Sequence, residues 1–228
     1  MKKIAIAALL TAASLTASAQ DIFDNPDNHA YFGVRLSYEL ASPTDVTTGN
    51  YLKIDMLDAS SGFAVSGVYN MPVWKNLYFE PGLTVSYNTV AYNKTFVNDL
   101  LEDELNVAGI RIDNASVRRW AFRIPMIVGY HFDFTPDVRV SLFTGPEFEL
   151  GLSAKAHIKS GDMTLTQGAY GKDKMLNRCD VKWRFGVGAT FMDHYYAAVS
   201  GAAGICDMAQ GPEKMRINLF DISLGYNF

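Results

Sequence analysis

The sequence of 228 residues lacks the motifs that identify most enzymes and the long apolar runs that form membrane-spanning helices. Its four histidines fall in no H-E-x-x-H pattern, and no G-x-S-x-G nucleophile motif is present. After the first 19 residues, no stretch approaches the roughly 18 consecutive apolar residues that a transmembrane helix needs. We therefore expect no enzyme activity, no catalytic residues, no metal site and no cofactor. A site assembled from distant loops is the alternative that the sequence leaves open.

Clusters of basic residues are also lacking. The chain carries 20 basic and 24 acidic side chains, and loss of two lysines with an N-terminal signal would leave a formal charge of −6. No group of basic residues interleaved with aromatic residues overrides this balance. The composition therefore argues against a nucleic-acid partner.

The first residues have the three parts of a secretory signal peptide. Lys2 and Lys3 supply the positive start, residues 4–16 form an apolar segment rich in alanine and leucine, and small residues precede Gln20. We expect cleavage between Ala19 and Gln20. The residue directly after that point is Gln20 and not a cysteine, so a lipoprotein anchor is not expected. A single spanning helix is the alternative, and the segment is too short for it.

Alternation of apolar and polar residues is what the remaining sequence has in abundance. Aromatic residues make up 13% of the chain, while its mean hydropathy is only +0.01. In "RRWAFRIPMIVGYHF" (118–132), every second residue from Trp120 to Phe132 is apolar, which is the period of a β-strand with one apolar face. The expected strands are residues 30–40, 62–71, 77–89, 118–132, 138–152, 181–191, 195–205 and 217–228.

The connections between these eight segments alternate strictly between short and long. The short ones are 72–76, 133–137 and 193–194; the long ones are 41–61, 90–116, 153–179 and 207–216. Membrane barrels show this asymmetry, with tight periplasmic turns and long extracellular loops, whereas a soluble sandwich has no reason to sort its loops by length. Both termini then lie on the periplasmic side.

The residue types on the two faces of the strands favour a lipid-facing exterior. The polar face carries the small residues that the narrow interior of an eight-stranded barrel requires, namely Gly33, Gly82, Gly129, Gly145, Gly186, Gly188 and Gly225. The apolar face has aromatic residues near both strand ends, with Tyr69, Phe79, Phe132, Tyr226 and Phe228 toward the turns and Tyr38, Tyr87, Trp120 and Trp183 toward the loops. Two aromatic belts around an aliphatic band are typical of a bilayer-spanning barrel.

We therefore predict an all-β protein, an eight-stranded antiparallel up-and-down transmembrane β-barrel in the outer membrane of a Gram-negative bacterium. A lipocalin-like soluble barrel is the alternative. The expected divisions are a signal peptide (1–19), a periplasmic N-terminal tail (20–29) and the barrel (30–228).

Charged residues of both signs fall on the inward face of the predicted strands. They are Arg35, Glu39, Glu80, Arg119, Arg123, Arg139, Glu147, Glu149, Lys182, Arg184 and Asp221. Because unpaired charges in a narrow lumen are costly, we expect a network of salt bridges that closes it. A gated or narrow ion path is the alternative.

The two cysteines lie at the predicted loop-side rim of one hairpin. Cys179 precedes one strand and Cys206 ends the next, and an exported protein meets an oxidising environment. We expect a disulfide between them. The alternation places them on opposite faces, so pairing needs a bulge or slack in the loop.

Several segments resemble the PorT-like outer-membrane β-barrel family. The likeness lies in "FRIPMIVGYHF", "SLFTGPEFELGLSAK", "WRFGVGATF" and the closing "ISLGYNF", with an I-P motif in one strand and a G-P motif in the next. The resemblance covers roughly residues 30–228 and supplies no catalytic residues. It implies that Tyr226 and Phe228 form the terminal signal read by the barrel-assembly machinery.

These observations favour a structural, adhesive or docking protein that acts through its extracellular loops. The expected partners are outer-membrane lipid, the assembly machinery during biogenesis, and an envelope protein. A narrow small-solute channel and, less favoured, a lipid-modifying enzyme are the alternatives.

Overall fold

The computed structural model describes residues 29–44, 46–48, 52–54, 57–58, 60–92, 113–135, 137–161, 163–171, 176–210 and 215–228. Within these ranges, no helix has the length and hydropathy needed to cross a membrane. The predicted signal peptide, its cleavage point between Ala19 and Gln20, and all but the last residue of the predicted tail lie outside the described residues.

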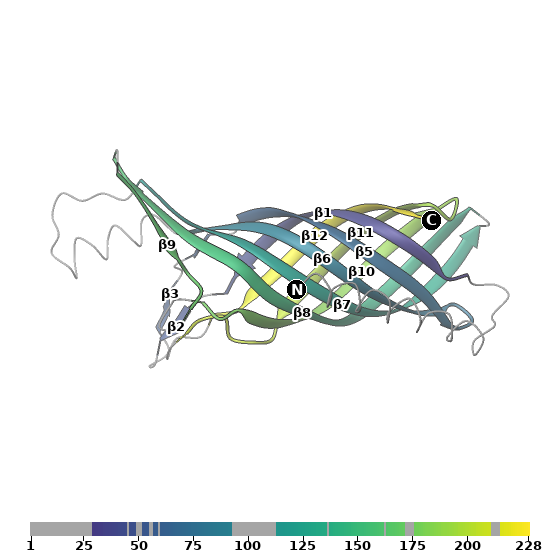
Figure 1. Ribbon diagram of the computed structural model, residues 1–228. Coiled ribbons are helices and arrows are strands. Elements are labelled where there is room, and N and C mark those ends of the chain that lie inside the picture. Colours follow the sequence, from purple (N-terminus) through teal and green to yellow (C-terminus); the bar gives the residue numbers. More distant parts are fainter. Residues whose placement is uncertain are drawn as a thin grey trace, which may run out of the picture.

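Eight long strands form the body of the protein (Figure 1). They are β1 (Tyr31–Pro43), β5 (Ser60–Trp74), β6 (Leu77–Tyr92), β7 (Asn114–Thr135), β8 (Val138–Ser160), β10 (Cys179–Phe191), β11 (Tyr195–Gly204) and β12 (Ile217–Asn227). Four shorter strands accompany them: β2 (Val46–Thr48), β3 (Leu52–Ile54), β4 (Leu57–Asp58) and β9 (Met163–Gly168).

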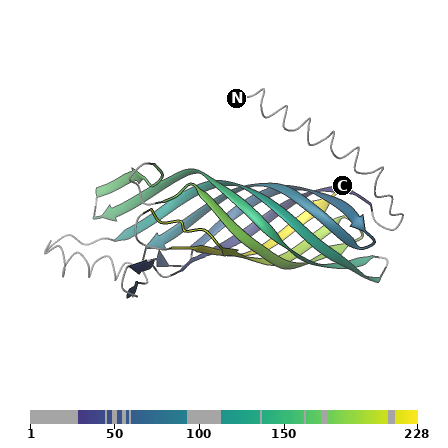
Figure 2. The same cartoon turned by 90° about the horizontal axis from the view of Figure 1, so that it is seen from below.

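The eight long strands close into a ring in which every neighbour is antiparallel. Strand β1 pairs with β5 on one side and with β12 on the other, so that Tyr38 lies opposite both Phe63 and Ile222. On the far side of the ring, β8 pairs with β10. Figures 1 and 2 show the resulting barrel, whose strands are tilted relative to its long axis. The predicted fold class is confirmed.

Short turns gather at one end of the barrel. Only Lys75 and Asn76 separate β5 from β6, and only Met192–His194 separate β10 from β11. Lys75, Met192 and Asp193 reverse the chain with positive φ angles of 47°, 51° and 59°. This end is called the short-turn end below, and the opposite end, where the longer connections lie, is called the long-loop end.

Two strands continue well past the ends predicted for them. Strands β7 and β8 run for 22 and 23 residues, and β9 folds back along β8 from Met163 to Gly168. The three strands project beyond the ring at the long-loop end (Figure 2). The predicted end at Leu152 was too early because an irregularity in the pairing there interrupts the alternation. Beyond it, the small residues Ala154 and Ala156 are buried on the inward face.

The two faces of the barrel have the predicted polarity. Large apolar side chains point outward, and Leu36, Phe63 and Leu224 are each more than half exposed. Charged side chains point inward, with Arg123 at 1% and Lys182 at 0% exposure. An apolar exterior around a charged interior is the reverse of a soluble protein and is typical of a barrel that lies in lipid.

Candidate functional site

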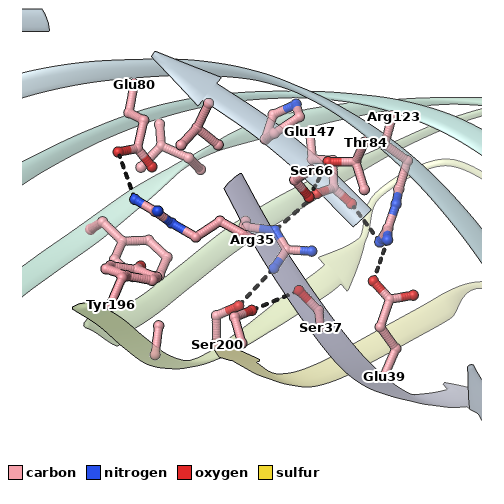
Figure 3. A pocket seen from close by; sticks show the side chains of 17 residues that line it. Arg35, Ser37, Glu39, Ser66, Glu80, Thr84, Arg123, Glu147, Tyr196 and Ser200 are labelled. Carbon is pink, nitrogen blue, oxygen red and sulfur yellow. Dashed lines mark hydrogen bonds and ion pairs between the residues drawn. The ribbon is translucent and has the colours of Figure 1, made fainter. Parts of the chain in front are cut away.

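The interior of the barrel is crossed by a chain of ion pairs, two of which join strands that are not neighbours. Arg123 on β7 pairs with Glu39 on β1, and its Nη1 lies 3.3 Å from Glu147 Oε1 on β8. Arg184 on β10 continues the chain, because its Nε lies 2.9 Å from Glu147 Oε2 and its Nη1 lies 2.6 Å from Asp221 Oδ2 on β12. Figure 3 shows Glu39, Arg123 and Glu147 converging in the lumen. The chain of charges therefore spans the ring from wall to wall.

A second group of ion pairs lies closer to the long-loop end. Arg119 pairs with Glu149, and Lys182 Nζ lies 2.6 Å from Glu149 Oε2 and 2.7 Å from Asp180 Oδ2. Arg119 Nε also donates to the Tyr170 hydroxyl at 3.2 Å. These side chains add a second obstructing layer above the first.

A third group, centred on Arg35, lies toward the short-turn end. Its Nη1 donates to Asn227 Oδ1 at 2.7 Å, and its Nη2 lies 3.9 Å from Glu80 Oε2. The guanidinium also lies over the Tyr196 ring, 3.8 Å from the centroid (Figure 3). Asn70 Nδ2 donates to Glu80 at 3.2 Å. Stacking and amide contacts thus take the place of a close ion pair here.

Aromatic residues fill the interior beyond Arg35. The ring of Tyr78 stacks on His131 at a centroid distance of 4.1 Å, and a side chain at Gly129 would meet the Tyr78 ring. His131 Nδ1 lies 2.7 Å from Ser141 Oγ. A serine beside a histidine is the arrangement of an activated nucleophile. Here both residues are only 2% exposed, and Nε2 of the imidazole has no partner among the described residues to orient it.

An apolar cap covers the charges at the long-loop end. It consists of Leu176, Met208 and Met215, which come from the connections and pack on small inward residues of the strands, such as Ala154 and Ala202. Met208 is fully buried, and its backbone N–H donates to Met215 O at 2.8 Å. The lengths of these connections predict extracellular loops outside the barrel. The run of small residues on the inward face of the strand ends is the signal for the inward fold, because it leaves room for the loops.

A small polar cavity remains between the charged groups. Its volume is about 70 Å³, space for a few water molecules, and its lining includes Arg35, Ser37, Thr84 and Ser200 (Figure 3). Within the part of the chain that the structure describes, Nε and Nη2 of Arg35 have no hydrogen-bond partner. The cavity therefore offers unused donors to water.

Ten of the eleven charged residues predicted for the lumen lie in these three groups. The exception is Arg139, which pairs at 2.7 Å with Asp133 beside a short turn, where the two side chains are 23% and 47% exposed. It lies too near the strand end to enter the network. Asp180 belongs to the network and was missed, because the predicted strand began one residue after it.

The predicted disulfide is absent from the structure, which holds both cysteines as free thiols. Cys179 is exposed on β10 while its neighbour Asp180 is buried, so the Cys179 side chain points outward. Cys206 is half-buried and lies beyond the end of β11 at Gly204.

The terminal residues predicted as an assembly signal lie at the short-turn end. Phe228 N donates to Phe32 O at 2.8 Å, and its ring lies 5.1 Å from Tyr226 and 6.2 Å from Phe32. In the described ranges, no cluster of three His, Cys, Asp or Glu side chains is arranged to hold a metal ion.

Comparison with known proteins supplies one family and several structures of similar shape. A family model described as "Outer membrane protein beta-barrel domain" matches residues 11–209. Among curated protein sequences, none matches this chain.

Ail, the attachment invasion locus protein of Yersinia pestis, is a solved structure similar to this chain. The two share 9% identity with a TM-score of 0.48, over 88% of this chain and 100% of that one. Neisserial surface protein A is similar with 13% identity and a TM-score of 0.39, over 88% and 98%. The outer membrane protein OprG from Pseudomonas aeruginosa has 10% identity and a TM-score of 0.44, over 87% and 96%.

Proposed function

We propose a function for this chain, which belongs to the outer membrane protein beta-barrel domain family. It is a non-conducting barrel that presents a docking surface on a Gram-negative cell. In this proposal the barrel is an anchor, and the work is done at the long-loop end by adhesion or by docking an envelope partner. It needs no cofactor and no catalytic residue.

The blocked lumen is the observation that carries the proposal. The chain of ion pairs from Glu39 through Arg123, Glu147 and Arg184 to Asp221 crosses the lumen, and the apolar cap around Met208 lies at its long-loop end. Charges packed in this way are expensive to separate, because each would be left buried without a partner. In the proposed closed barrel, these two layers together deny a solute an open path.

The projecting strands support a role for the long-loop end. Strand β9 is exposed along its whole length, and Met163 and Leu165 are 76% and 61% exposed. Large apolar side chains held away from both the core and the lipid are typical of contact surfaces. The hairpin of β8 and β9 is therefore our candidate for the docking element.

The orientation is part of the proposal. We place the short-turn end and both termini in the periplasm and the long-loop end outside, as the pattern of loop lengths predicts. The finer assignment to PorT-like proteins rests on the I-P motif at Ile124-Pro125 and the G-P motif at Gly145-Pro146.

A planar lipid bilayer experiment tests the closed lumen. The wild-type barrel is expected to give no steady single-channel current, because the ion pairs of Arg123, those of Arg119 and the apolar cap lie one behind another in the lumen. A steady current through the wild type would overturn the proposal. It would favour the second candidate, a narrow small-solute channel, which is supported by the polar cavity beside Arg35.

A further inference from the structure

Two basic residues face each other on the outer surface of the barrel near the long-loop end. Arg118 on β7 lies directly opposite Lys155 on β8, and both side chains are exposed. Residues paired across an antiparallel sheet have Cβ atoms about 5 Å apart, and like charges in these positions destabilise the pair. The strand register thus holds two cations together at a cost to the sheet.

Within the described part of the chain, no carboxylate relieves this repulsion. Among the described residues, neither Arg118 nor Lys155 forms an ion pair with a carboxylate. The carboxylate of Asp113 lies farther along the strands, beside Lys159, and accepts a hydrogen bond from the backbone N–H of Gly161 at 2.8 Å. The cationic pair therefore has unused capacity for an external anion.

The neighbours of the pair leave room for a ligand. Thr89 lies opposite Arg118 on β6, and Gly168 lies opposite Lys155 on β9, so the same row holds one short side chain and one glycine. A side chain at Gly168 would meet no atom within 4 Å. The two cations consequently stand in an open notch. Lys159, exposed on the same face of β8, adds a third positive charge farther along the strand.

The position of the notch relative to the aromatic belt indicates which anion would reach it. One step along the strands toward the middle of the barrel, Tyr87 pairs with Trp120, and their rings lie 5.0 Å apart on the outer surface. Aromatic residues of this kind sit at the level of the lipid headgroups. Arg118 and Lys155 lie two residues beyond them, which is about 7 Å along a strand. They are therefore at the height of the charged headgroups and not in the hydrocarbon.

We infer that Arg118 and Lys155 form a binding site for the phosphate of a lipid headgroup in the leaflet at the long-loop end. An arginine fork can hold two phosphate oxygens, and the lysine ammonium adds a point charge on the other side. The bound phosphate would offset the repulsion between the two cations. This site goes beyond the proposed docking role and requires only that the barrel spans a bilayer, so it is independent of whether the lumen conducts.

Lipid retention by the full chain tests the site. The barrel is reconstituted in phosphatidylcholine vesicles doped with a minor fraction of phosphatidic acid, extracted in mild detergent, and weighed by native mass spectrometry. The wild type is expected to retain phosphatidic acid, and the Arg118→Gln, Lys155→Gln double variant to retain it roughly 30-fold more weakly, from the loss of two juxtamembrane charges.

Arg216→Gln is the matched control. Arg216 is another exposed cation at the long-loop end. The residue across from it is the uncharged Thr44, whose backbone N–H donates to Arg216 O, so Arg216 does not face a second cation there. This variant is expected to retain lipid like the wild type. Equal retention by all three proteins, each first shown to be folded by its heat-dependent gel shift, would overturn the inference. Displacement of the lipid by inorganic phosphate at millimolar concentration would also overturn it, since the site would then bind free anions and not a headgroup.

Discussion

The Arg123 guanidinium pairs with Glu39 from the opposite wall of the barrel, although β5 and β6 separate their strands in the sheet. Both side chains are only 1% exposed, so the pair has almost no contact with water. A salt bridge that joins non-neighbouring strands is possible only where the lumen is narrow. The small diameter of the barrel therefore allows this salt bridge to cross the lumen.

Replacement of Arg123 by methionine should strongly destabilise the barrel. The change leaves Glu39 buried without its cation, and loss of one partner of a buried ion pair typically costs about 3–5 kcal/mol. The free energy of unfolding of the barrel in vesicles, measured by urea titration, checks this value. Adding Glu39→Gln to the same variant should recover part of the loss, because it removes the unpaired charge.

The pair between Arg139 and Asp133 provides the control for that prediction. Its atoms lie 2.7 Å apart, yet its side chains are 23% and 47% exposed. Exposed pairs contribute less than about 1 kcal/mol. Arg139→Gln should therefore change the free energy of unfolding far less than Arg123→Met, and comparable losses would show that burial does not set the strength of these pairs.

Gly129→Ala should destabilise the barrel through a clash in its interior. A Cβ atom at this position would lie 2.3 Å from the Tyr78 ring, which is buried and stacked on His131 and so has little room to move. Overpacking of this kind costs about 1–3 kcal/mol. Gly168→Ala is the matched control, since no atom lies within 4 Å of its Cβ position. Equal stability of the two variants would contradict the predicted clash.

The cysteines should react with a thiol reagent without prior reduction. Cys179 is exposed and Cys206 half-buried, and the structure holds both as free thiols. Purified, unreduced protein should therefore take up maleimide at Cys179 faster than at Cys206, as measured by peptide mass spectrometry. Labelling that appears only after reduction would instead restore the disulfide expected from the sequence.

The strands and their two faces were predictable because the information is local. Apolar residues recur at every second position from Trp120 to Phe132. The short turn at Lys75–Asn76 follows directly from the short spacing between the two apolar segments beside it. Neither feature depends on contacts between distant parts of the chain. The same reasoning identified most of the inward charges, because they occupy the other half of each alternation.

The partners of those charges were not predictable, since the stagger and curvature of the whole barrel decide them. Nothing in the sequence near Arg123 indicates that Glu39 is its partner. The apolar cap was missed for a related reason, because Leu176 and Met208 reach the lumen only through the path of their loops. The glycines were expected because a narrow lumen needs small residues. In the structure, aromatic rings occupy the space beside some of them, and the Phe143 ring lies where a side chain at Gly186 would be.

Removal of the Phe228 side chain should impair insertion of the barrel much more than the stability of barrels already formed. The ring is 69% exposed, and in the folded state it contacts mainly Tyr226 and Phe32 at the rim. Aromatic pairs of this kind contribute about 0.5–1.5 kcal/mol each, and the backbone bond from Phe228 N to Phe32 O remains in Phe228→Ala. A terminal signal read by the assembly machinery would instead be lost completely.

Heat-dependent gel shifts of outer membranes from cells give the inserted fraction, and urea titration of refolded protein gives the stability. Similar losses in both measurements would show that Phe228 acts as an ordinary packing residue.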